Sequence, residues 1–149
     1  MKISSICKRT VVTVYPETNL AEVARTMRNE HVGCVIVMDV HGKPVGLLTD
    51  RDIVVETLAC GVDPRIVTAG EIMTAGPVTV PADQDSAWAL KVMRERGVRR
   101  LPVVDDQGRL VGLLALDDVL ESAATGLYDV VQALGTERLQ ETQRRRAVA

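Results

Sequence analysis

The stretch Val45-Gly46-Leu47-Leu48-Thr49-Asp50-Arg51-Asp52 decides the fold of this chain. Its first residues form a short apolar run that predicts a buried strand, and residues 50–58 predict a helix that begins where the strand ends. Thr49 and Asp52 have the spacing of a capping box, which closes the first turn of a helix. The same groups can also hold a nucleotide, because a carboxylate accepts hydrogen bonds from ribose hydroxyls and free helix amides face a phosphate. This stretch alone leaves both interpretations open.

The pattern recurs at residues 111–118, where Gly112 repeats Gly46 after an interval of 66 residues. Sliding the chain by this interval, without a gap, pairs residues 12–14 with residues 78–80 and Asp52 with Asp118. Such self-similarity indicates an internal duplication. A unit of about 60 residues buries too little of its surface to be stable alone. We therefore expect the two repeats to pack on each other.

Each repeat is predicted to run strand, helix, strand, hairpin strand, helix. The predicted strands are residues 12–14, 34–38, 45–49, 78–80, 101–104 and 110–115, and the predicted helices are residues 18–30, 50–58, 85–96 and 116–125. Short helical turns are expected at residues 4–7 and 70–73, before each first strand. The expected organisation is a first repeat at 1–60, a linker at 61–70, a second repeat at 71–126, and a C-terminal helix with a charged tail at 127–149.

The composition points to an aliphatic core and to a limited set of partners. The chain has 149 residues, is 46% hydrophobic, contains no Phe and carries a formal net charge of −2. An aliphatic chain with helices between its strands suits an α/β sandwich, and the charge argues against a strong polyanion binder. No run of 18 apolar residues and no secretory leader is visible, so we expect a cytoplasmic protein without membrane contact. Arg144, Arg145 and Arg146 lack neighbouring aromatic residues and are interpreted as a solvated tail, which makes nucleic acid an unlikely partner.

Metal binding and catalysis have little support in the sequence. Cys7, Cys34 and Cys60 are scattered without a CxxC spacing, so neither a disulfide framework nor a zinc cage is indicated. His31 and Cys34 lie three residues apart, but no further ligand is near them in the sequence, and we predict no metal site. The chain has only two histidines, no nucleophile elbow and no Walker loop, and its carboxylates are not clustered beyond Asp50 and Asp52. We therefore predict that it is not an enzyme.

The doubled unit, with Gly-Leu-Leu-Thr-x-x-Asp after its last strand and Val-Arg-Arg-Leu-Pro-Val-Val-Asp at residues 98–105, resembles a tandem pair of cystathionine-β-synthase (CBS) domains. The resemblance covers residues 3–125 and is closest to stand-alone bacterial CBS-pair proteins. It implies a Bateman module of α/β (α+β) type, with two pseudo-two-fold-related β-α-β-β-α repeats whose small three-stranded sheets pack face to face. It also implies two clefts that bind adenosine-containing ligands, and pairing of two chains through the helices that flank the sheets.

Carried over by position, the resemblance assigns the first cleft Thr49 and Asp52 for the ribose, with Arg99 and Arg100 beside the phosphate. It assigns the adenine to backbone at Thr10, Val11, Val12, Val45, Gly46 and Leu47. The second, weaker cleft has Asp118, but Ala115 replaces the hydroxyl, and Gly33 and Cys34 stand where the first cleft has its arginines. A phosphate needs a counter-charge, and arginine supplies paired donors that match phosphate oxygens. We therefore expect only the first cleft to hold a phosphate.

These observations favour a regulatory module that takes AMP, ADP, ATP or a related adenosyl ligand and carries no catalytic cofactor. The signal would pass to a separate effector protein that the sequence does not name. A protein or nucleic-acid interaction scaffold and a nucleotide-acting enzyme are the alternatives. A homodimer is expected, because the helix faces and the apolar stripe of Leu127, Val130, Val131 and Leu134 offer more apolar surface than one chain can cover.

Overall fold

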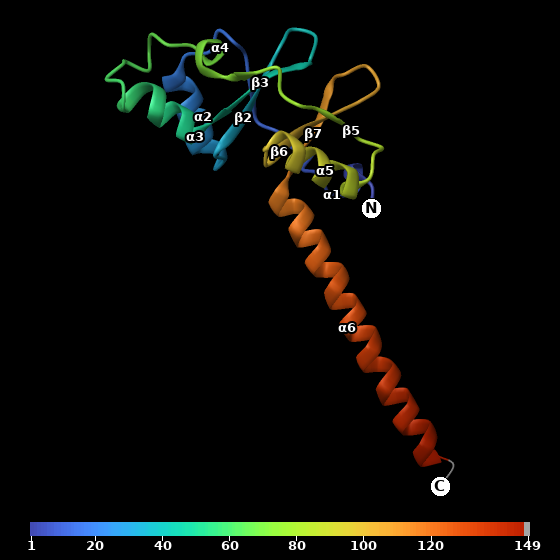
Figure 1. Cartoon of the computed structure of the whole chain (residues 1–149). Coiled ribbons are helices and arrows are strands. Elements are labelled where there is room, and N and C mark those ends of the chain that lie inside the picture. The colour runs from blue at the N-terminus through green and yellow to red at the C-terminus, as the bar shows by residue number, and fades with distance from the viewer. Residues whose placement is uncertain (148–149) are drawn as a thin grey trace.

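The computed structural model describes the backbone of residues 1–147 and the side chains of residues 1–140. Figure 1 shows two repeated units and a long C-terminal helix that projects from the second. The first unit contains β1 (Thr13–Val14), α2 (Leu20–Glu30), β2 (Cys34–Met38), β3 (Pro44–Thr49), α3 (Asp50–Ile53) and the π-helical turn η1 (Val54–Leu58). The second contains β5 (Val80–Pro81), α5 (Ser86–Arg96), β6 (Arg100–Val104), β7 (Leu110–Ala115) and the start of α6 (Leu116–Ala147). We call the segment that precedes each unit its lead-in. The lead-in of the first unit contains α1 (Ile3–Ile6), and the lead-in of the second contains α4 (Ala69–Ile72) and β4 (Thr74–Ala75).

The long helices of the two units begin and end for local reasons. The Asn19 side chain accepts a hydrogen bond from the Glu22 amide at 3.0 Å and caps α2, and Asp85 caps α5 through the Ala87 amide at 2.8 Å. The helices end at His31 and Gly97, which have φ angles of 55° and 65°. A residue in this left-handed region stops a helix. The predicted order of strands and helices is confirmed in both units.

The two sheets have the same pairing. In the first sheet, β1 runs parallel to β2, and β2 runs antiparallel to β3; β5, β6 and β7 repeat this arrangement in the second sheet. The registers also correspond, because Cys34 lies opposite Thr49 in one sheet and Arg100 lies opposite Ala115 in the other. The duplication and the predicted fold class are therefore confirmed. One difference is that β4 adds a fourth strand to the first sheet.

Each lead-in segment packs on the repeat that it does not precede. β4 comes before the second repeat but pairs with β3 of the first, and Lys8 exchanges two backbone hydrogen bonds with Leu113 of β7, at 2.9 and 3.0 Å. Ile3 is fully buried in the core of the second repeat, and Ala69 is fully buried in the core of the first. In Figure 1, α1 accordingly lies by α5, and α4 lies with the elements of the first unit. Neither repeat has a complete core without a segment from outside it.

The glycine of each Val-Gly-Leu-Leu run makes room for this exchange. A Cβ atom at Gly46 would collide with the side chain of Met73 from the α4 lead-in. At Gly112, a Cβ would lie 2.9 Å from the Cys7 sulfur and 3.1 Å from the Lys8 carbonyl oxygen. A larger residue at Gly112 would push against the lead-in backbone at Lys8, and one at Gly46 would displace the Met73 side chain.

α6 is longer than predicted. The helix predicted at residues 116–125 continues without a break through Gly126 and Gly135. A glycine inside a helix costs only about 1 kcal/mol relative to alanine, and the surrounding Leu, Gln, Glu and Arg residues favour a helix. No helix of the described residues is long and apolar enough to cross a membrane. The side chains of Arg144, Arg145 and Arg146, interpreted above as a solvated tail, lie outside those that the structure describes.

We predict that Gly112→Ala lowers the free energy of unfolding by about 1 to 3 kcal/mol, the usual cost of forcing an atom into a filled space. The melting temperature should fall by several degrees. Gly135→Ala is the control, because nothing lies within 4 Å of its Cβ position and the helix should gain stability. Thermal unfolding followed by circular dichroism compares the variants. Equal melting temperatures for Gly112→Ala and the wild type would show that the close approach is not required.

Candidate ligand clefts between the repeats

Two clefts lie where the repeats meet, and we name them after Leu47 and Leu113. The Leu47 cleft has a volume of about 230 Å³ and is lined by Leu47, Thr74, Gly76, Pro77, Val78, Val98, Arg99 and Arg100. The Leu113 cleft has a volume of about 250 Å³ and is lined by Lys8, Thr10, Val11, Val12, His31, Val32, Gly33, Cys34, Arg100, Leu113, Ala115, Asp117 and Asp118. Each residue of the Leu47 cleft has its counterpart, 66 positions away, in the Leu113 cleft. The two clefts are therefore products of the same duplication.

The structure corrects the grouping of Thr10, Val11 and Val12. These residues were expected beside Asp52, but they line the Leu113 cleft, and Gly76, Pro77 and Val78 take their place in the Leu47 cleft. The reason is the exchange of the lead-ins, which carries each of them to the last strand of the other repeat. The sequence interval pairs equivalent residues correctly but does not say which repeat they contact.

The Leu47 cleft brings together Leu47, Arg99 and Arg100, three of the residues predicted for the first cleft. Val45 and Gly46 do not line it. The Val45 carbonyl accepts a hydrogen bond from the Gly76 amide at 3.1 Å, and Met73 covers Gly46. Only Leu47 of this strand is thus left to form a wall.

Thr49 and Asp52 form the capping box at the start of α3. Asp52 Oδ2 accepts hydrogen bonds from the Thr49 amide and from Thr49 Oγ1, both at 2.8 Å, while Thr49 Oγ1 accepts one from the Asp52 amide at 3.2 Å. Neither residue lines the Leu47 cleft. The box uses Oδ2, and Oδ1 accepts no hydrogen bond from any side chain or backbone group of the described residues. The cap and a ligand contact are therefore compatible, because each can use its own oxygen.

The equivalent carboxylate in the Leu113 cleft has a different neighbourhood. Asp118 is buried, its Oδ2 accepts a hydrogen bond from the Ala115 amide at 2.8 Å, and Lys8 Nζ lies 3.6 Å from its Oδ1. Sequence reasoning missed Lys8, because the residue lies on the exchanged lead-in and its counterpart Thr74 has no charge. The expectation that only one cleft offers a cation is wrong, since Lys8 and Arg100 both line this one.

Cys34 lies at the entry of β2 and lines the Leu113 cleft together with Gly33. Both residues were assigned to the second cleft by the resemblance. Burial raises the pKa of its thiol to about 11, the positive charge of Arg100 opposes this shift, and the charges of Asp52 and Asp50 add to it. The thiol therefore stays protonated at neutral pH. Although His31 lines the same cleft, the described residues contain no group of three His, Cys, Asp or Glu side chains that could hold a metal ion.

Comparison with known proteins identifies the family. The model of the CBS domain matches residues 3–58 and again residues 69–125. The chain belongs to the CBS domain family. Its two repeats, which share the CBS fold, together form a CBS pair. The pair spans between 62% and 76% of the length of the first curated relatives that it matches.

Relatives of known structure share the arrangement of the CBS pair. Hypoxic response protein 1 of Mycobacterium tuberculosis is 37% identical over 109 residues, which are 73% of this chain and 76% of that protein. A crystal structure of hypoxic response protein I with two coordinated zinc ions superposes with a TM-score of 0.72 at 34% identity, over 81% of this chain and 98% of that one.

Two further similar structures contain adenosyl ligands. The cytosolic domain of the Mg²⁺ channel MgtE in complex with ATP is 31% identical with a TM-score of 0.71, over 81% of this chain and 48% of that one. The CBS pair of protein MJ0100 in complex with 5′-methylthioadenosine and S-adenosyl-L-methionine is 25% identical with a TM-score of 0.75, over 85% of this chain and 98% of that one.

The helix starts at Thr49 and Ala115 predict opposite changes in stability when the capping hydroxyl is removed from one and added to the other. Thr49→Ala removes one side-chain cap and should lower the free energy of unfolding by about 1 kcal/mol. Ala115→Thr supplies the missing hydroxyl above Asp118 and should raise it by up to about the same amount, because Ala115 borders an open cleft. Chemical denaturation measures both changes. A loss of stability in both variants would show that the second helix start does not accept a capping box.

Proposed function

We propose that this CBS pair is a regulatory module that binds AMP, ADP, ATP or a related adenosyl ligand and passes the signal to a separate effector protein. The observation that carries the proposal is the pair of clefts between the repeats. Each cleft is lined by two cationic side chains, Arg99 and Arg100 in the Leu47 cleft and Lys8 and Arg100 in the Leu113 cleft, and Asp118 also lines the second of them. The structurally similar cytosolic domain of MgtE was crystallised with ATP, and the CBS domain pair of MJ0100 was crystallised with 5′-methylthioadenosine and S-adenosyl-L-methionine. We further propose the cytoplasm as its compartment, where three free cysteines are stable.

The chemistry of the clefts suits the parts of a nucleotide. A carboxylate accepts hydrogen bonds from the two ribose hydroxyls, and Asp52 Oδ1 or Asp118 Oδ1 would serve as the acceptor. The guanidinium groups of Arg99 and Arg100 would pair with phosphate oxygens in a bidentate manner. The aliphatic walls from Leu47 and Leu113 would contact the adenine. We propose no catalytic step, and purified protein should not hydrolyse ATP.

We predict that Asp52→Ala weakens AMP and adenosine binding about tenfold to a hundredfold, the range for a lost hydrogen bond to a charged group. Thr49→Ala is the matched control, because it opens the same capping box but keeps the Asp52 carboxylate. Its affinity should change much less. Calorimetry well below both melting temperatures separates the two effects. Equal affinity in Asp52→Ala and the wild type would mean that Asp52 is a cap only.

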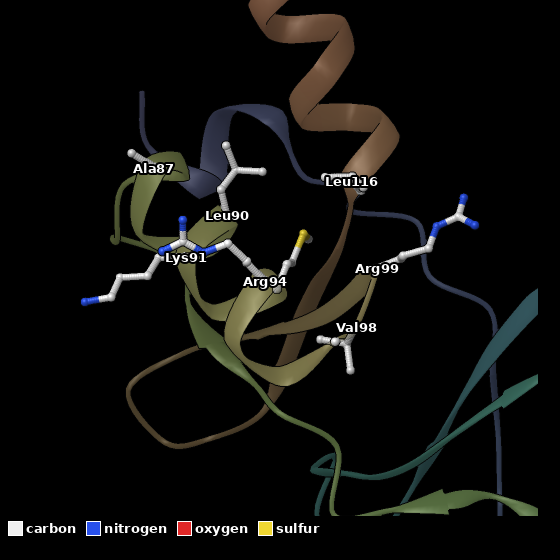
Figure 2. A pocket seen from close by; sticks show the side chains of 9 residues that line it. Ala87, Leu90, Lys91, Arg94, Val98, Arg99 and Leu116 are labelled. Atoms are coloured by element: carbon white, nitrogen blue, oxygen red, sulfur yellow. The ribbon is translucent and has the colours of Figure 1, made fainter.

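We also propose that the protein is a homodimer. A groove of about 680 Å³ lies between α5 and the start of α6 and includes Leu90 and Leu116; Figure 2 shows Lys91 and Arg99 extending to opposite sides of it. Leu120, Leu127 and Leu134 recur every seven residues on α6, and all three are more than half exposed. A heptad spacing of leucines suits pairing with a second helix, and a two-fold dimer lets the same stripe serve both chains.

This proposal predicts that Leu127→Glu shifts sedimentation toward the monomer at micromolar concentration. The charge would be buried between two helices, whereas Gln132→Glu, which lies away from the leucine stripe on α6, should leave the sedimentation coefficient unchanged. If the wild type sediments as a monomer, the stripe has another partner, which would favour an interaction scaffold. If Leu127→Glu remains a dimer, the chains pair elsewhere.

A further inference from the structure

Arg100 is the cation that both clefts share. It lines the Leu47 cleft and the Leu113 cleft, whereas Arg99 lines only the first of the two and Lys8 only the second. As the first residue of β6, Arg100 stands opposite Ala115, and its counterpart Cys34 stands opposite Thr49 at the start of β2. The small Cys34 side chain lies beside Arg100 in the wall of the Leu113 cleft.

The charge of Arg100 is available to a ligand. Within the part of the chain whose side chains are described, Arg100 takes part in none of the ion pairs, and it is only half-buried. Lys8, in contrast, already lies 3.6 Å from a carboxylate oxygen of Asp118. The Leu113 cleft therefore depends on Arg100 for an uncommitted positive charge, although the Leu47 cleft borders the same guanidinium.

One guanidinium cannot neutralise two phosphates. It carries a single positive charge, while a phosphate monoester carries about −1.5 to −2 charges at pH 7. A phosphate that binds in one cleft uses the Arg100 charge and adds its own negative charge beside the other cleft. A second phosphate then meets less attraction and more repulsion, and the penalty acts equally in both directions.

We propose that Arg100 makes the two clefts compete for phosphate-bearing ligands, so that a nucleotide in one cleft weakens binding of a nucleotide in the other. This inference rests on the proposed function, because it takes adenosyl ligands to bind in both clefts. The expected weakening is about tenfold, within the range usual for coupled sites. Uncharged adenosine escapes the competition, so a nucleotide in one cleft leaves the other open to an adenosyl ligand without a phosphate.

Leu47 and Leu113 supply one reporter for each cleft. We suggest titrating the full chain with AMP and separately with adenosine, and following the methyl resonances of these two leucines by NMR. In the wild type, the Leu47 cleft should fill with AMP first, because Arg99 and Arg100 both line it, and the Leu113 cleft should follow at higher concentration. Adenosine should bind each cleft with an affinity that does not depend on the arginines.

Arg99→Gln gives the decisive measurement. It should weaken AMP binding in the Leu47 cleft and strengthen it severalfold in the Leu113 cleft, which Arg99 does not line, because Arg100 is then released. Arg100→Gln is the matched comparison and should weaken AMP binding in both clefts. Adenosine titrations of both variants check that the clefts are intact.

The possible results separate this inference from the proposed function. If Arg99→Gln leaves the AMP affinity of the Leu113 cleft unchanged, the clefts are independent and the competition is overturned, while nucleotide binding stands. If neither AMP nor adenosine shifts either methyl resonance in the wild type, the proposed function falls and the competition falls with it. Should Arg100→Gln fail to fold, the AMP affinity of the Leu113 cleft in Arg99→Gln still decides whether the two clefts compete.

Discussion

The exchange of lead-in segments is the constraint on which the rest of the structure depends. Ile3 completes the core of the second repeat and Ala69 completes the core of the first, so each half of the duplication needs the other. This follows from size, because about 60 residues with an aliphatic core bury too little surface to fold independently. Gly46 and Gly112 are the local requirement, since each allows a lead-in to lie directly on the strand that it completes.

The same exchange makes both clefts composite. The Leu113 cleft combines the first lead-in, the entry of β2 and the end of β7, so a ligand there touches both repeats at once. Asp117 and Asp118 of this cleft belong to the first turn of α6. A ligand that contacts Asp118 therefore contacts the base of the element that projects farthest from the module in Figure 1. The ligand contact at Asp118 and the exposed part of α6 are thus joined through the first turn of the same helix.

Much of this arrangement could be predicted from the sequence, because the relevant interactions are local. The caps at Asn19 and Asp85, the positive-φ glycines Gly42 and Gly108 in the turns between β2 and β3 and between β6 and β7, and the alternation of strand and helix each depend on residues that are close in the sequence. Lys8 and the true position of residues 10–12 could not be predicted, because the repeat interval identifies equivalent residues but not their partners. The sequence also predicted a helix that ends at residue 125, whereas α6 continues through Gly126 and Gly135, because a single glycine weakens a helix without ending it.

The duplication also explains why Arg100, and not Arg99, belongs to both clefts. Cys34 and Arg100 are equivalent by the repeat interval, yet both line the Leu113 cleft. Two equivalent residues can share one cleft only if they lie close to the axis that relates the repeats. A side chain at this place reaches both clefts, whereas Gly33 and its counterpart Arg99 each line a single one. Arg100 occupies one of the two positions beside this axis, and the small thiol of Cys34 occupies the other. The two repeats are therefore nearly symmetric, but they place a single positive charge between two similar clefts.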